Sequence, residues 1–204
     1  MAIKLFYAPK TRSTRPRWML EELGVPYEIV RINLGEKQHL GAEYKKVHPL
    51  GLVPAMEIDG TKLIESSAMV GYLADKFAEK GLAPSLNSKD RLPYSQWMAF
   101  AQITLESSVL AYWLNTAKLP EEKRHADLAQ DALTNFRAAA EVVDKVLATN
   151  EYLVGNAFSA ADILMASVLS FAKVVGLPIG DFRSLPTYLD RCKARPAFKR
   201  AIAD

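Results

Sequence analysis

The chain has 204 residues, half of them apolar, and its 26 basic and 23 acidic side chains leave a net charge of +3. So small an excess does not predict binding to nucleic acid, and no apolar run approaches the ~18 residues that would cross a membrane. Because no basic stretch followed by an apolar stretch and a cleavage site opens the chain, we expect a cytoplasmic protein with neither nucleic acid nor membrane among its partners.

The start of the chain predicts a strand, a helix and a second strand. Residues 3–7 and 27–31 carry the apolar and aromatic side chains of short strands, and residues 15–23 place apolar side chains on one helical face. Thr14 is a suitable N-cap for this helix, and Gly24 a suitable stop. We expect the two strands to be parallel and joined by a right-handed crossover.

A hairpin and a further helix follow. After one short helix at 42–47, residues 56–58 and 62–64 predict two strands joined by Asp59-Gly60, a pair that tight hairpin turns favour. Residues 66–77 show the spacing of an amphipathic helix. This order of elements predicts a small mixed sheet with helices packed on it.

Beyond this region the strand pattern stops. Residues 81–89 are rich in glycine, proline, serine and asparagine and predict a linker between a first domain, 1–80, and a second, 90–204. Helical patterns follow at residues 92–116, 121–148, 159–175, 185–193 and from 196 onward. We therefore expect an α/β domain followed by an all-helical bundle.

One motif in the second domain predicts stability and not chemistry. Ser159 stands at a helix start and Asp162 three residues later, the arrangement of a capping box. Phe158 and Ile163 flank the pair and can staple the entry to the helix.

The cysteine and histidine residues do not predict a metal or redox site. Cys192 is the one cysteine of the sequence, which excludes an internal disulfide and a Cys-x-x-Cys pair, and we expect a half-buried helix residue there. His39, His48 and His125 are scattered without the spacing of metal ligands.

Two short stretches carry most of the functional information: Val53-Pro54-Ala55 and Glu65-Ser66-Ser67. The strand before the proline can pair with the backbone of a bound peptide. A helix start can take a carboxylate, and an acidic residue beside it can take an ammonium group. This layout suits a small zwitterionic peptide.

Four stretches, taken in their order and spacing, carry a family resemblance: Trp18-Met19-Leu20-Glu21-Glu22-Leu23, His48-Pro49-Leu50-Gly51-Leu52-Val53-Pro54-Ala55, Glu65-Ser66 and Ser159-Ala160-Ala161-Asp162. They resemble the cytosolic glutathione transferases, and theta- and phi-like members in particular. The resemblance covers essentially the whole chain. It implies a thioredoxin-like first domain that binds glutathione and a helical second domain that supplies most of the pocket for an electrophile.

The resemblance also implies roles for single residues in binding glutathione. The Val53-Pro54 bond would be cis, and Val53 would pair with the cysteinyl part of the ligand. Glu65 would take the γ-glutamyl ammonium, Ser66 the adjacent carboxylate, and His39 the glycine carboxylate. Leu52 stands where the family often carries lysine or glutamine, so this contact is missing or supplied elsewhere.

The catalytic hydroxyl is less plainly marked. The serine of phi- and theta-like members falls on Thr11, with Ser13 as the second candidate to donate a hydrogen bond to the thiolate. Arg12 takes the place of a cysteine that zeta-like members carry, which argues against maleylacetoacetate isomerase activity, and its charge could steady the thiolate. The lack of a catalytic cysteine argues against an omega- or beta-like thiol-disulfide role. Candidates for the electrophile pocket are Tyr7, Phe100, Thr104 and Tyr112.

The resemblance thus implies a glutathione transferase that conjugates small hydrophobic electrophiles, with glutathione as co-substrate and no metal. It further implies a homodimer, with Met69 and Tyr72 as candidates for the interface. Two alternatives stay open at this point: a glutathione-dependent peroxidase or dehalogenase on the same scaffold, and a non-catalytic protein-binding module.

Overall fold

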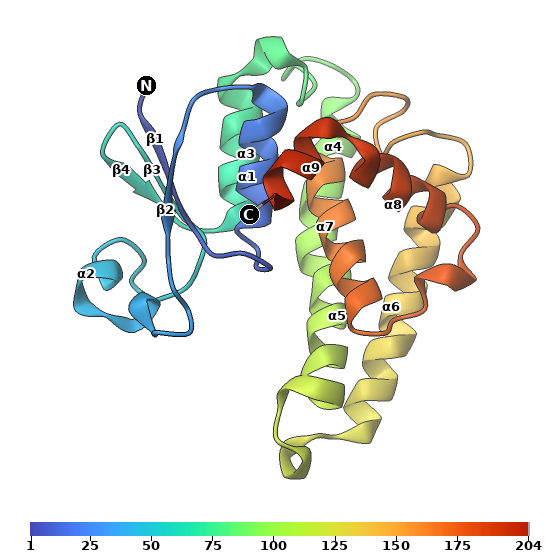
Figure 1. Ribbon diagram of the computed structural model, residues 1–204. Helices are drawn as coiled ribbons and strands as arrows, with labels where there is room; N and C mark the ends of the chain where they lie inside the picture. Colours follow the sequence, from blue (N-terminus) through green and yellow to red (C-terminus); the bar gives the residue numbers. More distant parts are fainter. Residues whose placement is uncertain (204) are drawn as a thin grey trace. The chain divides into compact units, whose positions relative to one another are not determined.

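The computed structural model describes residues 1–203 (Figure 1). Contacts along the chain form two compact units, Met1–Ala83 together with the chain from Ala194 onward, and Pro84–Lys193. The sequence pattern assigned the last helix to the helical domain, whereas these contacts group it with the first unit.

The first unit is built on a mixed four-stranded sheet. Strand β1 (Ile3–Tyr7) pairs in parallel with β2 (Glu28–Arg31) and antiparallel with β3 (Ala55–Ile58), and β3 pairs antiparallel with β4 (Thr61–Leu63). The strand order is β2-β1-β3-β4. The predicted parallel pair and hairpin are both confirmed.

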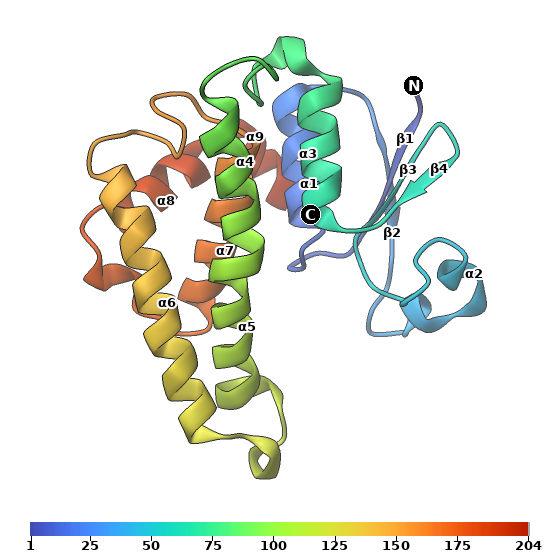
Figure 2. The same cartoon turned by 180° about the vertical axis from the view of Figure 1, so that it is seen from behind.

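Two helices, α1 (Thr14–Leu23) and α3 (Ser66–Lys76), lie side by side on one face of this sheet, as both views show (Figures 1 and 2). Leu5 and Tyr7 alternate along β1 toward the buried core. Phe6 points to the opposite face, where its ring lies 5.9 Å from that of Tyr44 in the short helix α2 (Ala42–Lys45).

The ends of α1 differ in how well the sequence predicted them. Gly24 adopts φ 65° and donates its N–H to the Leu20 carbonyl at 3.0 Å, so the predicted stop is confirmed. The helix begins one residue earlier than predicted. Its N-cap is therefore Ser13 and not Thr14, and the Ser13 side chain makes no capping hydrogen bond.

The last helix, α9 (Pro196–Ile202), packs against α1. The Phe198 ring lies 4.7 Å from that of Trp18. Arg195 binds both carboxylate oxygens of Glu22, at 2.6 and 2.8 Å, and Arg200 lies 2.6 Å from Glu21 Oε2. These polar and aromatic contacts tie the end of the chain to the first unit.

The second unit is all helical, as predicted. The predicted helix at 92–116 is divided into α4 (Arg91–Ala99), a π-helical segment (Phe100–Leu105), α5 (Glu106–Trp113) and a second π-helical segment (Leu114–Lys118). The remaining helices are α6 (Ala126–Leu147), α7 (Ala160–Val174) and α8 (Leu185–Ala194).

Short 3₁₀ segments occupy Gln38–Leu40, Ala78–Lys80, Glu121–Lys123 and Ile179–Asp181. Cys192 is fully buried and not half-buried as predicted. Among the described helices, none is both long enough and apolar enough to cross a membrane.

Candidate functional site

The start of α3 leaves several polar groups open. Glu65 is its N-cap, with φ 73° and ψ 108°, and the Glu65 side chain makes no capping hydrogen bond. The first helical bond comes from Met69 N–H to the Glu65 carbonyl, at 3.1 Å. Within residues 1–203, the N–H groups of Ser66, Ser67 and Ala68 therefore find no acceptor, and the exposed Glu65 carboxylate makes no hydrogen bond or ion pair.

Ser66 is buried at this helix start, and its hydroxyl oxygen accepts a hydrogen bond from a residue of α1. Arg15 of α1, 2% exposed, donates from Nη1 to Ser66 Oγ at 3.3 Å. Arg15 belongs to a basic run, Lys10 to Arg17, that can attract an anionic ligand, but its contact with Ser66 joins residues 51 positions apart and leaves no local signal in the sequence.

The segment before β3 also has backbone N–H and C=O groups without hydrogen-bond partners in the described part of the chain. The Val53-Pro54 peptide bond is cis, as the resemblance implied. In the described part of the chain no hydrogen bond uses the N–H or C=O of Val53, which is half-buried. The carbonyl of Leu52 accepts from Tyr44 Oη at 2.7 Å, while the Leu52 side chain is exposed. Burial raises the pKa of Tyr44 to about 12, so this donor stays protonated at neutral pH.

A glycine brings the loop with His39 against this segment. Gly51 has φ 62°, and a Cβ placed on it would lie 2.6 Å from the His39 carbonyl oxygen. Only glycine suits this backbone and this close approach. The half-buried His39 therefore lies next to the residues that lead into Val53, and its Nδ1 has no hydrogen-bond partner among residues 1–203.

The two candidate hydroxyls at the start of α1 lie 2.9 Å apart and differ in access. Ser13 is fully buried, and its Oγ accepts from the Ala8 N–H at 3.3 Å. Thr11 is half-buried, and its one proton is shared between two acceptors, the Ala8 carbonyl at 2.7 Å and Ser13 Oγ at 2.9 Å. Arg12, between them, is exposed.

His48 lies in the loop that leads to Val53. Its side chain is 4% exposed, and its Nδ1 finds no hydrogen-bond partner in the described chain. Burial lowers the pKa of His48, an effect that the negative charge of Glu65 partly offsets. His48 is therefore neutral at pH 7.

The residues predicted for the electrophile have unequal access. Tyr7 is 1% exposed, with the Arg17 guanidinium 4.8 Å from its ring centre, so its side chain belongs to the core. In the second unit, Phe100 and Thr104 lie in the first π-helical segment and Tyr112 in α5. Phe100 and Tyr112 are half-buried and Thr104 is exposed.

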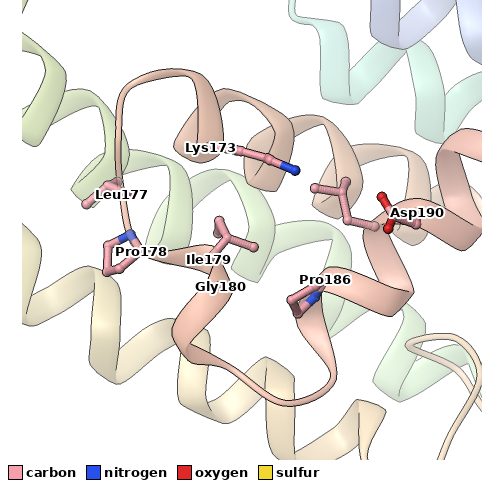
Figure 3. A pocket seen from close by; sticks show the side chains of 8 residues that line it. Lys173, Leu177, Pro178, Ile179, Gly180, Pro186 and Asp190 are labelled. Carbon is pink, nitrogen blue, oxygen red and sulfur yellow. The ribbon is translucent and has the colours of Figure 1, made fainter.

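A small pocket lies apart from all these residues. It has a volume of about 160 Å³ and is lined by the end of α7, the following loop and α8 (Figure 3): Lys173, Leu177, Pro178, Ile179, Gly180, Pro186, Leu189 and Asp190. None of the predicted site residues lines it. Among residues 1–203, no three or more His, Cys, Asp or Glu side chains gather as metal ligands would.

Comparison with known proteins agrees with this arrangement. Residues 1–75 match the family model for the glutathione S-transferase N-terminal domain, and residues 107–196 that for the C-terminal domain. Glutathione S-transferase GstA of Escherichia coli O157:H7 is 28% identical over 98% of both chains.

Solved structures agree over the same length. A glutathione transferase from Methylococcus capsulatus is 30% identical, with a TM-score of 0.85 over 98% of this chain and 97% of that one. A sphingomonad glutathione S-transferase, solved as a complex with glutathione, is 29% identical, with a TM-score of 0.84 over 98% and 96% of the two chains. With both domains matched and a 30% identical relative covering 98% of its length, the chain belongs to the glutathione S-transferase family of enzymes.

Proposed function

We propose that this enzyme binds glutathione along the first unit and transfers its thiolate to small hydrophobic electrophiles. The observation that supports this most is the pair of open backbones, at Val53 and at the start of α3. Backbone groups away from water and from helix ends are nearly always paired, so the unpaired N–H and C=O of the half-buried Val53, together with an open helix start, support a ligand with matching groups.

The γ-glutamyl end of glutathione matches the start of α3. Its carboxylate would accept from the free N–H groups of Ser66 and Ser67 and from the Ser66 hydroxyl, at the positive end of the helix dipole. Its ammonium group would pair with the Glu65 carboxylate. The solved sphingomonad complex with glutathione supports the choice of this ligand.

The rest of the peptide would continue across the same unit. Val53 would pair with the cysteinyl residue through two backbone hydrogen bonds, as an added strand does. His39 would take the glycine carboxylate, since Gly51 brings its loop next to Val53. Leu52 supplies shape only, because its exposed side chain has no polar group and its carbonyl is already bonded.

The start of α1 would hold the sulfur as an anion. A free thiol has a pKa of about 8.5, so a donor that bonds the anion raises the thiolate fraction at pH 7. We assign this donor to Thr11, which is accessible; its proton would turn from the Ala8 carbonyl and Ser13 Oγ to the sulfur, while the Ser13 N–H, 3.1 Å from Thr11 Oγ1, holds the oxygen in place. The positive end of α1 and the charge of Arg12 would add to the effect.

The reaction itself would need little further chemistry. With a chloronitroarene, the thiolate sulfur forms a bond to the ring carbon, the carbon–chlorine bond breaks, and chloride leaves with the electron pair. Phe100, Thr104 and Tyr112 are our candidates for contacts with the electrophile. We also propose a cytoplasmic homodimer. Of the two interface candidates, only Tyr72, 46% exposed, is on the surface, because Met69 is fully buried in its own unit.

The test combines calorimetric titration with glutathione and a conjugation assay, on the unchanged protein, Thr11→Val, Thr11→Ser and Ser13→Ala. We expect Thr11→Val to lower turnover about tenfold or more while the Kd for glutathione changes less than threefold, and Thr11→Ser to restore most of the rate. Turnover of hydroperoxides or haloalkanes without conjugation would favour the peroxidase or dehalogenase. Binding without any turnover would favour the non-catalytic module.

A further inference from the structure

A buried arginine stands behind the helix start that we assign to the γ-glutamyl group. Arg15 is 2% exposed and donates from Nη1 to Ser66 Oγ at 3.3 Å. We propose that Arg15 is a positioning residue: it turns the Ser66 hydroxyl toward the ligand and makes the site selective for the γ-glutamyl α-carboxylate. This inference rests on the proposed function and adds a residue to it.

The hydrogen-bonding capacity of the two side chains fixes their roles. A guanidinium group only donates, so Ser66 Oγ must be the acceptor of this bond. The single Ser66 hydroxyl proton is then left over, and it meets no acceptor within the described residues. Arg15 thereby keeps the hydroxyl in the one role that a bound carboxylate requires, that of donor.

The charge of Arg15 acts in the same direction. A guanidinium group stays protonated in proteins, and burial strengthens its field relative to that of an exposed one. This positive charge lies one hydrogen bond behind Ser66, at the positive end of α3. A ligand carboxylate at that place gains from both, whereas a ligand without the carboxylate gains from neither.

The chain offers a matched control in the same helix. Arg17 is also buried, 7% exposed, but its Nη2 donates to the Ala203 carbonyl at 2.8 Å and its guanidinium lies over the Tyr7 ring. A substitution at Arg17 therefore removes a buried guanidinium from α1 without touching Ser66. A loss of affinity for glutathione that Arg15 and Arg17 variants share would come from disturbed packing of α1. A loss of affinity confined to Arg15 variants would come from the contact with Ser66.

The experiment measures the Kd of two peptides by calorimetry: glutathione, and the analogue in which hydrogen replaces the γ-glutamyl α-carboxylate. The proteins are the unchanged chain, Arg15→Met, Arg15→Lys and Arg17→Lys, each checked by circular dichroism and thermal unfolding. We expect Arg15→Met to weaken the binding of glutathione about tenfold or more, and the binding of the analogue less than threefold. Arg15→Lys keeps the charge and should lose less affinity for glutathione than Arg15→Met. Arg17→Lys should leave the ratio of the two Kd values unchanged.

A second arm keeps the test decisive if Arg15→Met does not fold. In a Ser66→Ala background, Arg15→Lys should weaken glutathione less than it does in the unchanged chain, because the contact it disturbs is already gone. The role of Arg15 would be overturned if Arg15 variants lost equal affinity for both peptides, or if Arg15→Lys had the same effect with Ser66 present and with Ser66→Ala. Either outcome would leave the glutathione site standing. No binding of glutathione by the unchanged chain would overturn the proposed function as well.

Discussion

Helices α3 and α7 both begin with a serine and an acidic residue, yet they use these residues in opposite ways. At α7, Ser159 and Asp162 form a capping box in which each side chain pairs with a backbone N–H of the other residue. At α3, neither Glu65 nor Ser66 caps the helix. Every helix start leaves about four N–H groups unpaired. Pairing them inside the chain stabilises the fold, and leaving them open provides a site for an anion.

The surroundings of the two acidic residues follow this division. Asp162 is fully buried and accepts hydrogen bonds from Leu153 N–H, Ser159 N–H and Tyr188 Oη at 2.9 to 3.0 Å. Burial raises the pKa of Asp162 although these bonds act to lower it. Glu65 is exposed, and its positive φ of 73° is a conformation that residues other than glycine adopt at a cost.

The largest expected effect comes from removing Asp162, which closes the start of α7 in the capping box. Asp162→Ala would leave Leu153 N–H, Ser159 N–H and Tyr188 Oη without their acceptor, and each such loss costs about 1–3 kcal/mol. We expect the free energy of unfolding to fall by about 4 kcal/mol in a urea titration. At low temperature, where the variant is folded, its Kd for glutathione should stay within about twofold of the original.

An exposed aspartate provides the control for this variant. Asp181 pairs with Arg137 at 2.8 Å, with both side chains about half exposed, so Asp181→Asn should change stability by less than about 0.5 kcal/mol. A loss below about 1 kcal/mol for Asp162→Ala would mean that water or a shifted side chain replaces the carboxylate, and that the start of α7 is not closed in the way described.

The same substitution at each start sharpens the comparison. Ser159→Ala removes half of the capping box and should cost about 1 kcal/mol of stability without changing the Kd for glutathione. Ser66→Ala removes no cap but takes the acceptor from the buried Arg15 Nη1, so stability should fall by about 1 kcal/mol while glutathione binds about tenfold more weakly. Thermal unfolding and calorimetry on the two variants give both numbers. The comparison fails if the two serines show the same pattern.

A substitution of Glu65, at the start of α3, should raise stability and lower the affinity for glutathione. Glu65→Gly relieves the positive φ and removes the carboxylate that we assign to the ligand's ammonium group. We expect a gain of about 1 kcal/mol in stability, together with a loss of about tenfold or more in affinity for glutathione. Glu65→Gln serves as the control, since it loses the charge but keeps the strain. A destabilised Glu65→Gly variant would show that the backbone here is not strained.

Local features were predictable from the sequence, and long-range ones were not. The Asp59-Gly60 turn, the Gly24 stop and the Ser159–Asp162 box each depend on residues within a few positions of one another, so short patterns carry them. Glu65 and Ser66 were found through a resemblance that joins two stretches of the chain.

The contact from Arg15 to Ser66 and the ion pair of Arg195 with Glu22 span 51 and 173 positions. No periodicity records which distant side chain will meet a helix start, and for this reason the last helix was assigned to the other unit. The π-helical segment at Phe100–Leu105 was missed because its hydrophobic pattern is close to that of an ordinary helix.

The smallest expected effect is a dependence on pH, and it carries opposite signs in the two regions. Burial lowers the pKa of His48 in the folded chain below its value of about 6.5 in the unfolded chain, so between the two values the unfolded chain binds more protons. The stability that neutral His48 contributes is present above about pH 6.5 and is lost as pH falls toward the folded pKa. Asp162, whose pKa is raised, contributes stability as pH falls through that raised value.

Substituting His48 separates the two contributions. Between about pH 7 and pH 5, His48→Asn should remove part of the loss in unfolding free energy, and His125→Asn, at an exposed histidine, serves as the control. Urea titrations at a series of pH values measure both. Bound glutathione would place an ammonium group at Glu65, which offsets the charge that favours protonated His48. Saturating glutathione should therefore steepen the loss of stability with falling pH more in the unchanged chain than in His48→Asn. If ligand changes the slope equally in both proteins, His48 does not sense the open start of α3.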